Sequence, residues 1–199
     1  LGHFIMMRWI HRSDEPLHLY GSQGLQRMVD LLLEMHGPDV ELRQITRSLP
    51  RPAPNVIVHE ISEGPILETP NGVKVSAFRV EHYPLDEPFG FRFDTKNKSI
   101  AFSGDTCPSE NLIKHTHKVD VLVHESTEYT KWDAPDVDHS HKVKTHTHPE
   151  KLGFVAQDAE PGLLIATHLM PRSVPWELRE MISEGYKGNL LIGEDLMTA

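Results

Sequence analysis

The sequence is poor in several features that would place it in a specialised class. It has one cysteine, Cys107, so it cannot form an internal disulfide, and it has only 20 Lys and Arg against 29 Asp and Glu. The formal net charge of −9 disfavours an extended nucleic-acid surface, because phosphate binding needs clustered Lys and Arg. No apolar run approaches the roughly 20 residues that span a bilayer, and residues 1–12 lack a signal-peptide pattern. We therefore expect a cytoplasmic protein with no membrane segment.

Length and composition favour an ordinary globular chain that is rich in histidine. The 199 residues, 38% of them hydrophobic, are enough to bury one core, and we expect a single domain over residues 1–199. There are 14 His, many of them between residues 115 and 168. Imidazole is a common ligand of transition metals, so the many histidines in this region favour a metal site.

Three apolar runs end in residues that can perform chemistry. SIAFSGDT reads as a strand that leads to Asp105, VDVLVHES as one that ends in His124 and Glu125, and GLLIATHL as one that ends in His168. In open α/β layers the ligand crevice lies beyond the carboxyl ends of the strands. The sequence therefore predicts that these side chains lie together in one polar site at the carboxyl ends of the strands.

The other patterns predict an α/β fold. Residues 56–93 read as short strands, with a hairpin at Asn71-Gly72, and strands alternate with helices after residue 99. A helix that begins near Leu25 is predicted to stop at His36-Gly37-Pro38. The run from Thr147 to Glu150 has the form of a capping box and predicts a helix to about residue 158. We expect helices that cover sheets, in the manner of a sandwich.

Asp105, His168 and His82 are the strongest candidates for a metal site. His82 ends the strand-like run VKVSAFRVEH, so it too is predicted at a strand terminus. Carboxylate and imidazole suit zinc, and they also suit manganese or iron. The alternative is structural: each His would be a satisfied, partly buried side chain, and Asp105 a turn former after Gly104. For His139 and His141 a solvated loop is the preferred interpretation.

These motifs resemble the metallo-β-lactamase superfamily, and within it the branch of RNase Z-like and arylsulfatase-like hydrolases. The resemblance rests on SGDT, the downstream HES, HTHPEKLGFVAQDAE and ATHLMP, and it covers most of the chain. A His followed by a Gly-aromatic pair, here His82 with Gly90 and Phe91, is similar to another metal motif of the family. The resemblance implies an αββα sandwich and a hydrolase with two zinc ions.

The resemblance also implies a role for each matching residue. His82 would bind the first metal, Asp105 would bridge both, and His168 would bind the second. His146 would bind or protonate the scissile group, and Glu125 would hold a histidine in its working tautomer. His124 would pack or orient its neighbours.

One family signature is absent. The run HxHxDH, which supplies further ligands in the family, occurs nowhere in the 199 residues. In related chains the segment after that run is similar to the one that begins at Leu1. The expectation is a C-terminal portion of the full domain, with three of seven ligands present, weak metal binding and little turnover.

The function expected from the resemblance is hydrolysis of a phosphodiester or related small ester by hydroxide that two zinc ions activate. RNase Z members usually carry a protruding basic arm, which this sequence lacks, so a small substrate is favoured over folded RNA. tRNA 3′ processing and β-lactamase or lactonase activity remain alternatives on the same scaffold. In a different class, the chain would be a non-catalytic interaction module. A homodimer is compatible with the sequence.

Overall fold

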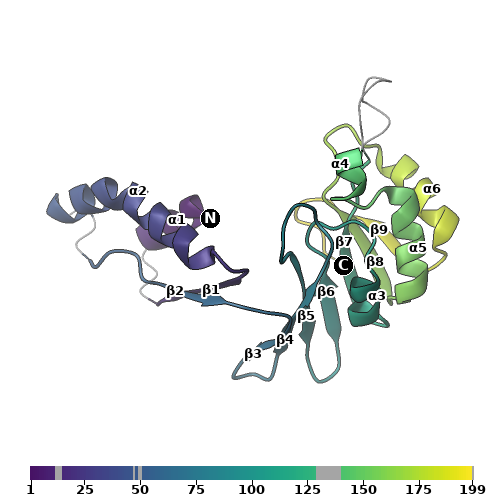
Figure 1. Cartoon of the computed structure of the whole chain (residues 1–199), viewed down its shortest axis with the longest axis horizontal. Helices are drawn as coiled ribbons and strands as arrows, with labels where there is room; N and C mark the ends of the chain where they lie inside the picture. The colour runs from purple at the N-terminus through teal and green to yellow at the C-terminus, as the bar shows by residue number, and fades with distance from the viewer. Residues whose placement is uncertain (12–14, 47, 49–50, 129–139, 199) are drawn as a thin grey trace. The chain divides into compact units, whose positions relative to one another are not determined.

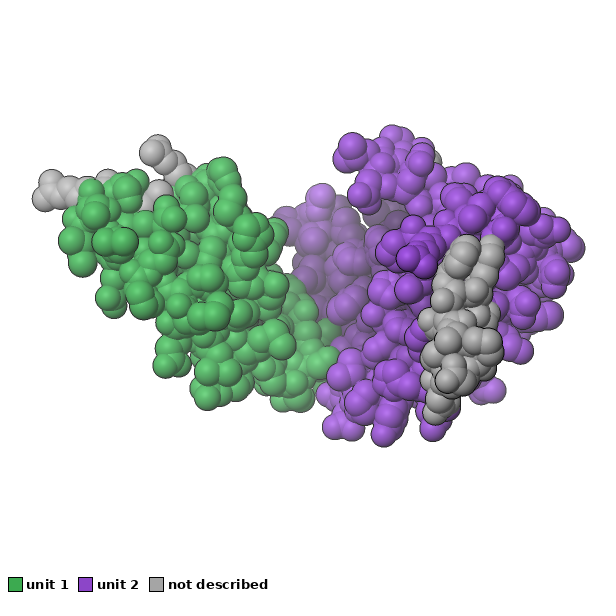
Figure 2. All heavy atoms as spheres, turned by 90° about the horizontal axis from the view of Figure 1, so that it is seen from above, with its two compact units in different colours: residues 1–62 green, residues 63–199 purple. Residues whose placement is uncertain are grey.

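The structure is a computed structural model that describes residues 1–11, 15–46, 48, 51–128 and 140–198. The chain divides into two compact units, Leu1–Ser62 and Glu63–Ala199, which Figure 2 distinguishes by colour. We call them the first and the second unit. No helix in the described residues is long and apolar enough to cross a membrane.

The first unit is a two-stranded parallel sheet with two helices. Its elements, in chain order and labelled in Figure 1, are α1 (Gly2–Ile10), β1 (Leu17–Gly21), α2 (Leu25–Ile45) and β2 (Val56–Glu60). Met6 and Trp9 of α1 pack with Val40 of α2 in a small buried cluster. The Trp9 indole donates a hydrogen bond to the carbonyl of Pro52, at 2.8 Å, so the helix layer is tied to the segment that precedes β2.

Helix α2 corrects one prediction, because it continues through Pro38 to Ile45. A proline inside a helix removes one hydrogen bond and typically costs about 3 kcal/mol. Val40, two residues beyond the proline, is only 6% exposed and packs on α1. Burial of this side chain, together with the hydrogen bonds of the last turns, offsets the cost of the proline. The helix-breaking residues Gly37 and Pro38 therefore do not decide where α2 ends.

The second unit is a seven-stranded sheet in which the strands follow one another in chain order from β3 to β9. Pairing is antiparallel from β3 to β6 and parallel from β6 to β9. The predicted hairpin at Asn71-Gly72 joins β3 to β4, with Gly72 in the left-handed region at φ 84°. The strands are β3 (Gly64–Glu68), β4 (Lys74–Arg79), β5 (Phe89–Asp94), β6 (Ser99–Phe102), β7 (Val121–Glu125), β8 (Leu163–Thr167) and β9 (Leu190–Ile192).

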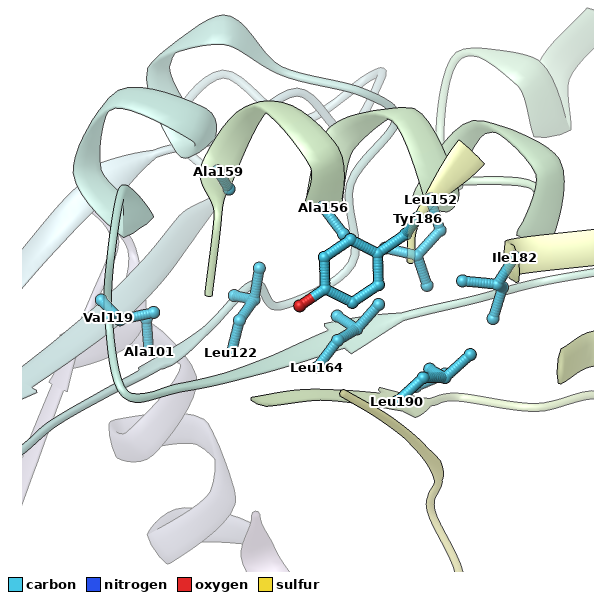
Figure 3. Close-up of a cluster of buried hydrophobic side chains, with 11 residues drawn as sticks. Ala101, Val119, Leu122, Leu152, Ala156, Ala159, Leu164, Ile182, Tyr186 and Leu190 are labelled. Atoms are coloured by element: carbon cyan, nitrogen blue, oxygen red, sulfur yellow. The ribbon is translucent and has the colours of Figure 1, made fainter. Parts of the chain in front are cut away.

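Helices cover one face of the parallel part of this sheet. Figure 3 shows Leu122 and Leu164 of the sheet beneath α5, with the Tyr186 ring between the layers. Alternation along β7 and β8 places every second side chain on this face, and the strand pairing aligns them. The helices of the second unit are α3 (Glu110–Thr116), α4 (Ser140–Val143), α5 (Pro149–Ala159) and α6 (Pro175–Gly185). The predicted α/β class is confirmed.

Glycines allow α5 and α6 to approach closely, and this contact gives a stability prediction. A Cβ at Gly153 would lie 2.4 Å from the carbonyl oxygen of Ile182 and 3.1 Å from the Cα of Gly185. We expect Gly153→Ala to lower the free energy of unfolding by roughly 1–3 kcal/mol, because backbone must move to make room. Urea denaturation measures the change. Gln157→Ala, at an exposed position of the same helix, is the matched control and should alter stability by less than about 0.5 kcal/mol.

Candidate metal centre

The three polar strand ends meet at one edge of the sheet, as predicted. β7 pairs in parallel with β6 on one side and β8 on the other, so their carboxyl ends point the same way. Asp105 follows β6 after Gly104, where the φ of 64° favours glycine and where a Cβ would lie 2.9 Å from the Phe89 carbonyl oxygen. Glu125 closes β7, and His168 follows β8. All of these residues belong to the second unit.

Asp105, His146 and His168 converge on one point. One potential ligand atom from each lies within 4.8 Å of the other two. Asp105 Oδ1 is 3.7 Å from His168 Nδ1, and the rings of His146 and His168 stack with centroids 5.3 Å apart. One carboxylate and two imidazoles, all at least partly accessible, form a donor set that suits a divalent transition metal. Their spacing and chemistry fit the ion that the sequence predicts.

His82 lies beside this cluster and has one ring nitrogen already engaged. Its Nδ1 is 2.6 Å from the carbonyl oxygen of Thr145. A carbonyl can only accept, so Nδ1 carries the proton and Nε2 keeps its lone pair. The His82 ring meets the His146 ring edge-on, with centroids 5.2 Å apart. A carbonyl that orients a histidine in this way is common around metal ligands. The role of His82 as a ligand stays a prediction.

Glu125 is a buried carboxylate that organises the residues around the cluster. Its side chain is only 2% exposed, and its Oε1 accepts hydrogen bonds from the backbone N–H groups of Thr106 and Thr147, both at 3.1 Å. Among the described residues, its Oε2 is buried without a hydrogen-bond partner. Burial raises the pKa of Glu125 to about 7, although the two backbone hydrogen bonds oppose this shift.

The contact with Glu125 fixes the tautomer of His146. His146 Nδ1 lies 2.9 Å from Glu125 Oε1, an oxygen that already acts as an acceptor. Nδ1 is therefore the protonated nitrogen, and Nε2 is left for a metal ion or a substrate. Burial holds the pKa of His146 below its usual value, and the nearby Asp105 carboxylate opposes that effect. His146 thus belongs to the group of convergent side chains, where the sequence predicted it as a catalytic residue and His82 as a ligand beside it.

Thr147 corrects the predicted capping box. The residue that caps α5 is His148, without a side-chain capping hydrogen bond. The Thr147 hydroxyl instead donates to the carbonyl oxygen of Thr106, at 2.7 Å. This bond joins the start of α5 to the loop that carries Asp105, and sequence reasoning missed both threonines. For Thr147, the alternation of Thr and His in KTHTHPE was the sequence pattern that could have indicated a role at the site.

His124 is buried and is not one of the three convergent residues. It is completely buried, and its Nδ1 lies 2.7 Å from the carbonyl oxygen of Glu125. Burial lowers the pKa of His124 to about 4. The structure therefore places it as a packed, neutral side chain, in agreement with the predicted packing role.

The buried imidazole of His124 predicts a pH-dependent stability. Its pKa is lower in the folded chain than the unfolded value of 6.5, so the unfolded state binds the extra proton first. The stabilisation is complete above about pH 6.5 and is lost as the pH falls to about 4. Between pH 6.5 and 4 the free energy of unfolding of the parent should fall by roughly 3 kcal/mol more than that of His124→Gln. Urea denaturation at several pH values gives the two slopes, and parallel slopes would contradict the assignment.

The residues before His146 add positive charge beside the cluster. α4 carries Lys142 and His141, and both lower the pKa of His146 through their charge. The His141 ring meets the exposed Tyr83 ring edge-on at 6.4 Å, and Lys144 Nζ lies 5.8 Å from the centre of that ring. His139 lies outside the described residues.

Comparisons with known proteins concern the family and the fold of this chain. Residues 12–169 match the family model described as a beta-lactamase superfamily domain. Ribonuclease Z of Mycobacterium bovis (strain BCG / Pasteur 1173P2) is 25% identical over 206 residues, which cover 98% of this chain and 72% of the relative. Ribonuclease Z of Mycobacterium sp. (strain KMS) is 26% identical over 202 residues, covering 98% and 70%.

Solved structures show the same fold. The metallo-beta-lactamase fold protein YhfI from Bacillus subtilis aligns with a TM-score of 0.68 at 18% identity, over 97% of this chain and 68% of the other. The short form of human tRNase Z aligns with a TM-score of 0.67 at 19% identity, over 99% and 71%. These similarities confirm the predicted fold class.

Proposed function

The chain belongs to the metallo-β-lactamase superfamily, and on that premise we propose that it is a metal-dependent hydrolase that cleaves phosphodiester bonds. The convergence of Asp105, His146 and His168 at one edge of the sheet carries this proposal. The interaction-module alternative gives no reason for these three side chains to share one point at the ends of separate segments.

Asp105 and His168 would hold the metal, and His82 would add a third ligand through its free Nε2. We favour zinc, because two imidazoles and a carboxylate are among its usual ligands. Such an ion, when bound, supplies Lewis-acid polarisation of the scissile group and a nucleophile at neutral pH. Manganese and iron accept the same donors and are the alternatives.

His146 and Glu125 would move the proton. His146 is one of the three convergent residues, and its Nδ1–H is held by Glu125 Oε1 at 2.9 Å, which leaves Nε2 for the substrate. In this orientation Nε2 can take up a proton and give it to the leaving oxygen, a contribution of roughly 10²–10⁴ in rate. Glu125 stabilises the imidazolium that forms, because the buried carboxylate lies against the nitrogen that carries the other proton.

The surroundings of the cluster favour a substrate with an anionic phosphodiester. Lys142 and Lys144 supply positive charge near His146 in a chain whose formal net charge is −9. The acidic net charge of −9 disfavours an extended polyanion such as a folded RNA, so a small diester is the primary candidate.

Cleavage of precursor tRNA is the second candidate. The observation in its favour is that curated relatives named ribonuclease Z match 98% of this chain. At 25–26% identity these relatives leave the substrate open. The same centre would serve either substrate, since both reactions hydrolyse a phosphodiester.

A substrate panel tests the proposal. The purified chain with Zn²⁺ or Mn²⁺ is offered bis(p-nitrophenyl) phosphate, p-nitrophenyl sulfate, a homoserine lactone, nitrocefin and a precursor tRNA. We expect slow hydrolysis of the phosphodiester, in line with the weak metal binding and low turnover expected of these residues, and we expect it to be abolished by a chelator and restored by the metal. Turnover of the sulfate, lactone or β-lactam without the diester would overturn the assignment. Cleavage of the tRNA at low salt with no activity on the small diester would favour the second candidate.

A further inference from the structure

Two histidines of the first unit form a pair that the proposed hydrolase does not use. His18 lies on β1 and His59 on β2, and His18 Nδ1 is 3.0 Å from His59 Nε2. His18 is exposed and His59 is half-buried, so the pair is open to solvent. Both belong to a compact unit that contains none of the residues of the candidate metal centre.

The pairing of the strands explains why the two rings meet. β1 and β2 are parallel, with His18 opposite Ile57 and Tyr20 opposite His59. Side chains alternate between the faces of a strand, so His18, Tyr20 and His59 share one face. The intervening Leu19 and Val58 point to the other face. The sheet itself, and not a flexible loop, brings the two imidazoles together.

Tyr20 holds one of the rings in place. Its ring stacks on His59 with centroids 4.4 Å apart and an interplanar angle of 9°. The His18 ring lies nearly parallel to His59, with centroids 5.3 Å apart and an angle of 13°, and meets it through the two nitrogens. A pre-ordered ring loses less conformational freedom when it binds a ligand, so the affinity is higher than for two free surface histidines.

The spacing of the nitrogens matches two positions around one metal ion. Two nitrogens each about 2.0–2.1 Å from a tetrahedral ion lie about 3.3 Å apart. The observed 3.0 Å is close to this spacing, and rotation of the exposed His18 side chain would turn its lone pair toward an ion shared with His59. At present one ring must donate its N–H to the lone pair of the other, and a divalent ion can take the place of that shared proton.

We propose that His18 and His59 form a second divalent-metal site, in which Cu²⁺, Ni²⁺ or Zn²⁺ binds between His18 Nδ1 and His59 Nε2. Imidazole nitrogen suits these three ions, and Cu²⁺ should bind most tightly. Solvent completes the coordination, so the site is weaker than a four-ligand structural site and exchanges its metal readily. It is independent of the hydrolase proposed above.

Titration of the whole chain with CuCl₂, followed by nuclear magnetic resonance, tests the site without any substitution. Paramagnetic Cu²⁺ broadens amide signals close to it. At substoichiometric Cu²⁺ we expect loss of the amide signals of residues 18–20 and 57–59, in addition to any loss around Asp105 and His168. Broadening confined to the residues around Asp105 and His168 would overturn the proposal.

Variants then identify the ligands. In equilibrium dialysis, His18→Ala and His59→Ala should each weaken Cu²⁺ binding at the first-unit site by at least tenfold. His3→Ala, at an exposed histidine of α1 in the same unit, is the matched control and should bind like the parent. Circular dichroism verifies that each variant is folded. Unchanged affinity in both folded variants, or an equal loss in the control, would refute the assignment of these two ligands.

Discussion

Replacing Asp105 by asparagine is expected to abolish most of the metal affinity and the hydrolytic activity. Asparagine keeps the size of the side chain but removes the negative charge that attracts a divalent ion. We expect Zn²⁺ affinity to fall by roughly 100-fold. Hydrolysis should fall by roughly 10²–10³, the scale of losing one electrostatic stabiliser of the transition state. Calorimetric Zn²⁺ titration and initial rates on bis(p-nitrophenyl) phosphate measure the two effects.

Asp158→Asn is the matched control for this experiment. Asp158 is an exposed carboxylate on α5, and the same substitution there removes the same charge from the protein. It should leave both the Zn²⁺ affinity and the rate within about twofold of the parent. If Asp105→Asn kept full Zn²⁺ affinity, the placement of the metal at this strand end would be wrong. A metal effect without a rate effect would separate the binding site from the hydrolytic site.

His146→Ala should reduce kcat by roughly 10²–10³, because Nε2 of this ring is the proposed site of proton exchange. Glu125 acts through His146, so Glu125→Gln should reduce kcat by roughly 10–100-fold and leave KM nearly unchanged. The glutamine carbonyl can still accept from Thr106, Thr147 and His146, while the negative charge that stabilises an imidazolium is gone. Steady-state kinetics with the diester substrate gives both constants.

The double variant distinguishes a positioning role from a separate catalytic role. If Glu125 works only through His146, the kcat of the double variant will equal that of His146→Ala alone. Multiplicative losses would show that Glu125 acts on its own. The pH dependence of kcat adds a second readout, since a structural role for Glu125 would not move the pH–rate profile. Circular dichroism of each variant is the folding control.

Much of the fold could be predicted because its signals are local. Period-two alternation and uninterrupted apolar runs mark the strands, and Asn71-Gly72 marks the hairpin that joins β3 to β4. The end of α2 could not be predicted, since it depends on the burial of Val40 against Met6 and Trp9. The length of a helix with a proline inside it is decided by contacts with another helix, which the local sequence does not contain.

The candidate site, too, could be predicted only in part from the sequence. That Asp105, Glu125 and His168 end three neighbouring strands could be read from the sequence, because each follows an apolar run. The sequence alone did not reveal that one oxygen of Glu125 accepts from Thr106, Thr147 and His146 together. These partners are 19–22 residues from Glu125. The pairing of β6 with β7 brings Thr106 to it, and the placement of the segment before α5 brings His146 and Thr147.

By itself, then, the sequence determined which side chains stand at the ends of the strands, because strand patterning and residue chemistry are properties of short segments. The tertiary structure decided which nitrogen of each histidine stays free. The Thr145 carbonyl occupies Nδ1 of His82, and Glu125 occupies Nδ1 of His146. Both contacts join residues that are distant in sequence, 63 positions apart in the first case. The physical reason is that a hydrogen bond selects a tautomer through geometry at the scale of tenths of an ångström, which only the packed fold supplies.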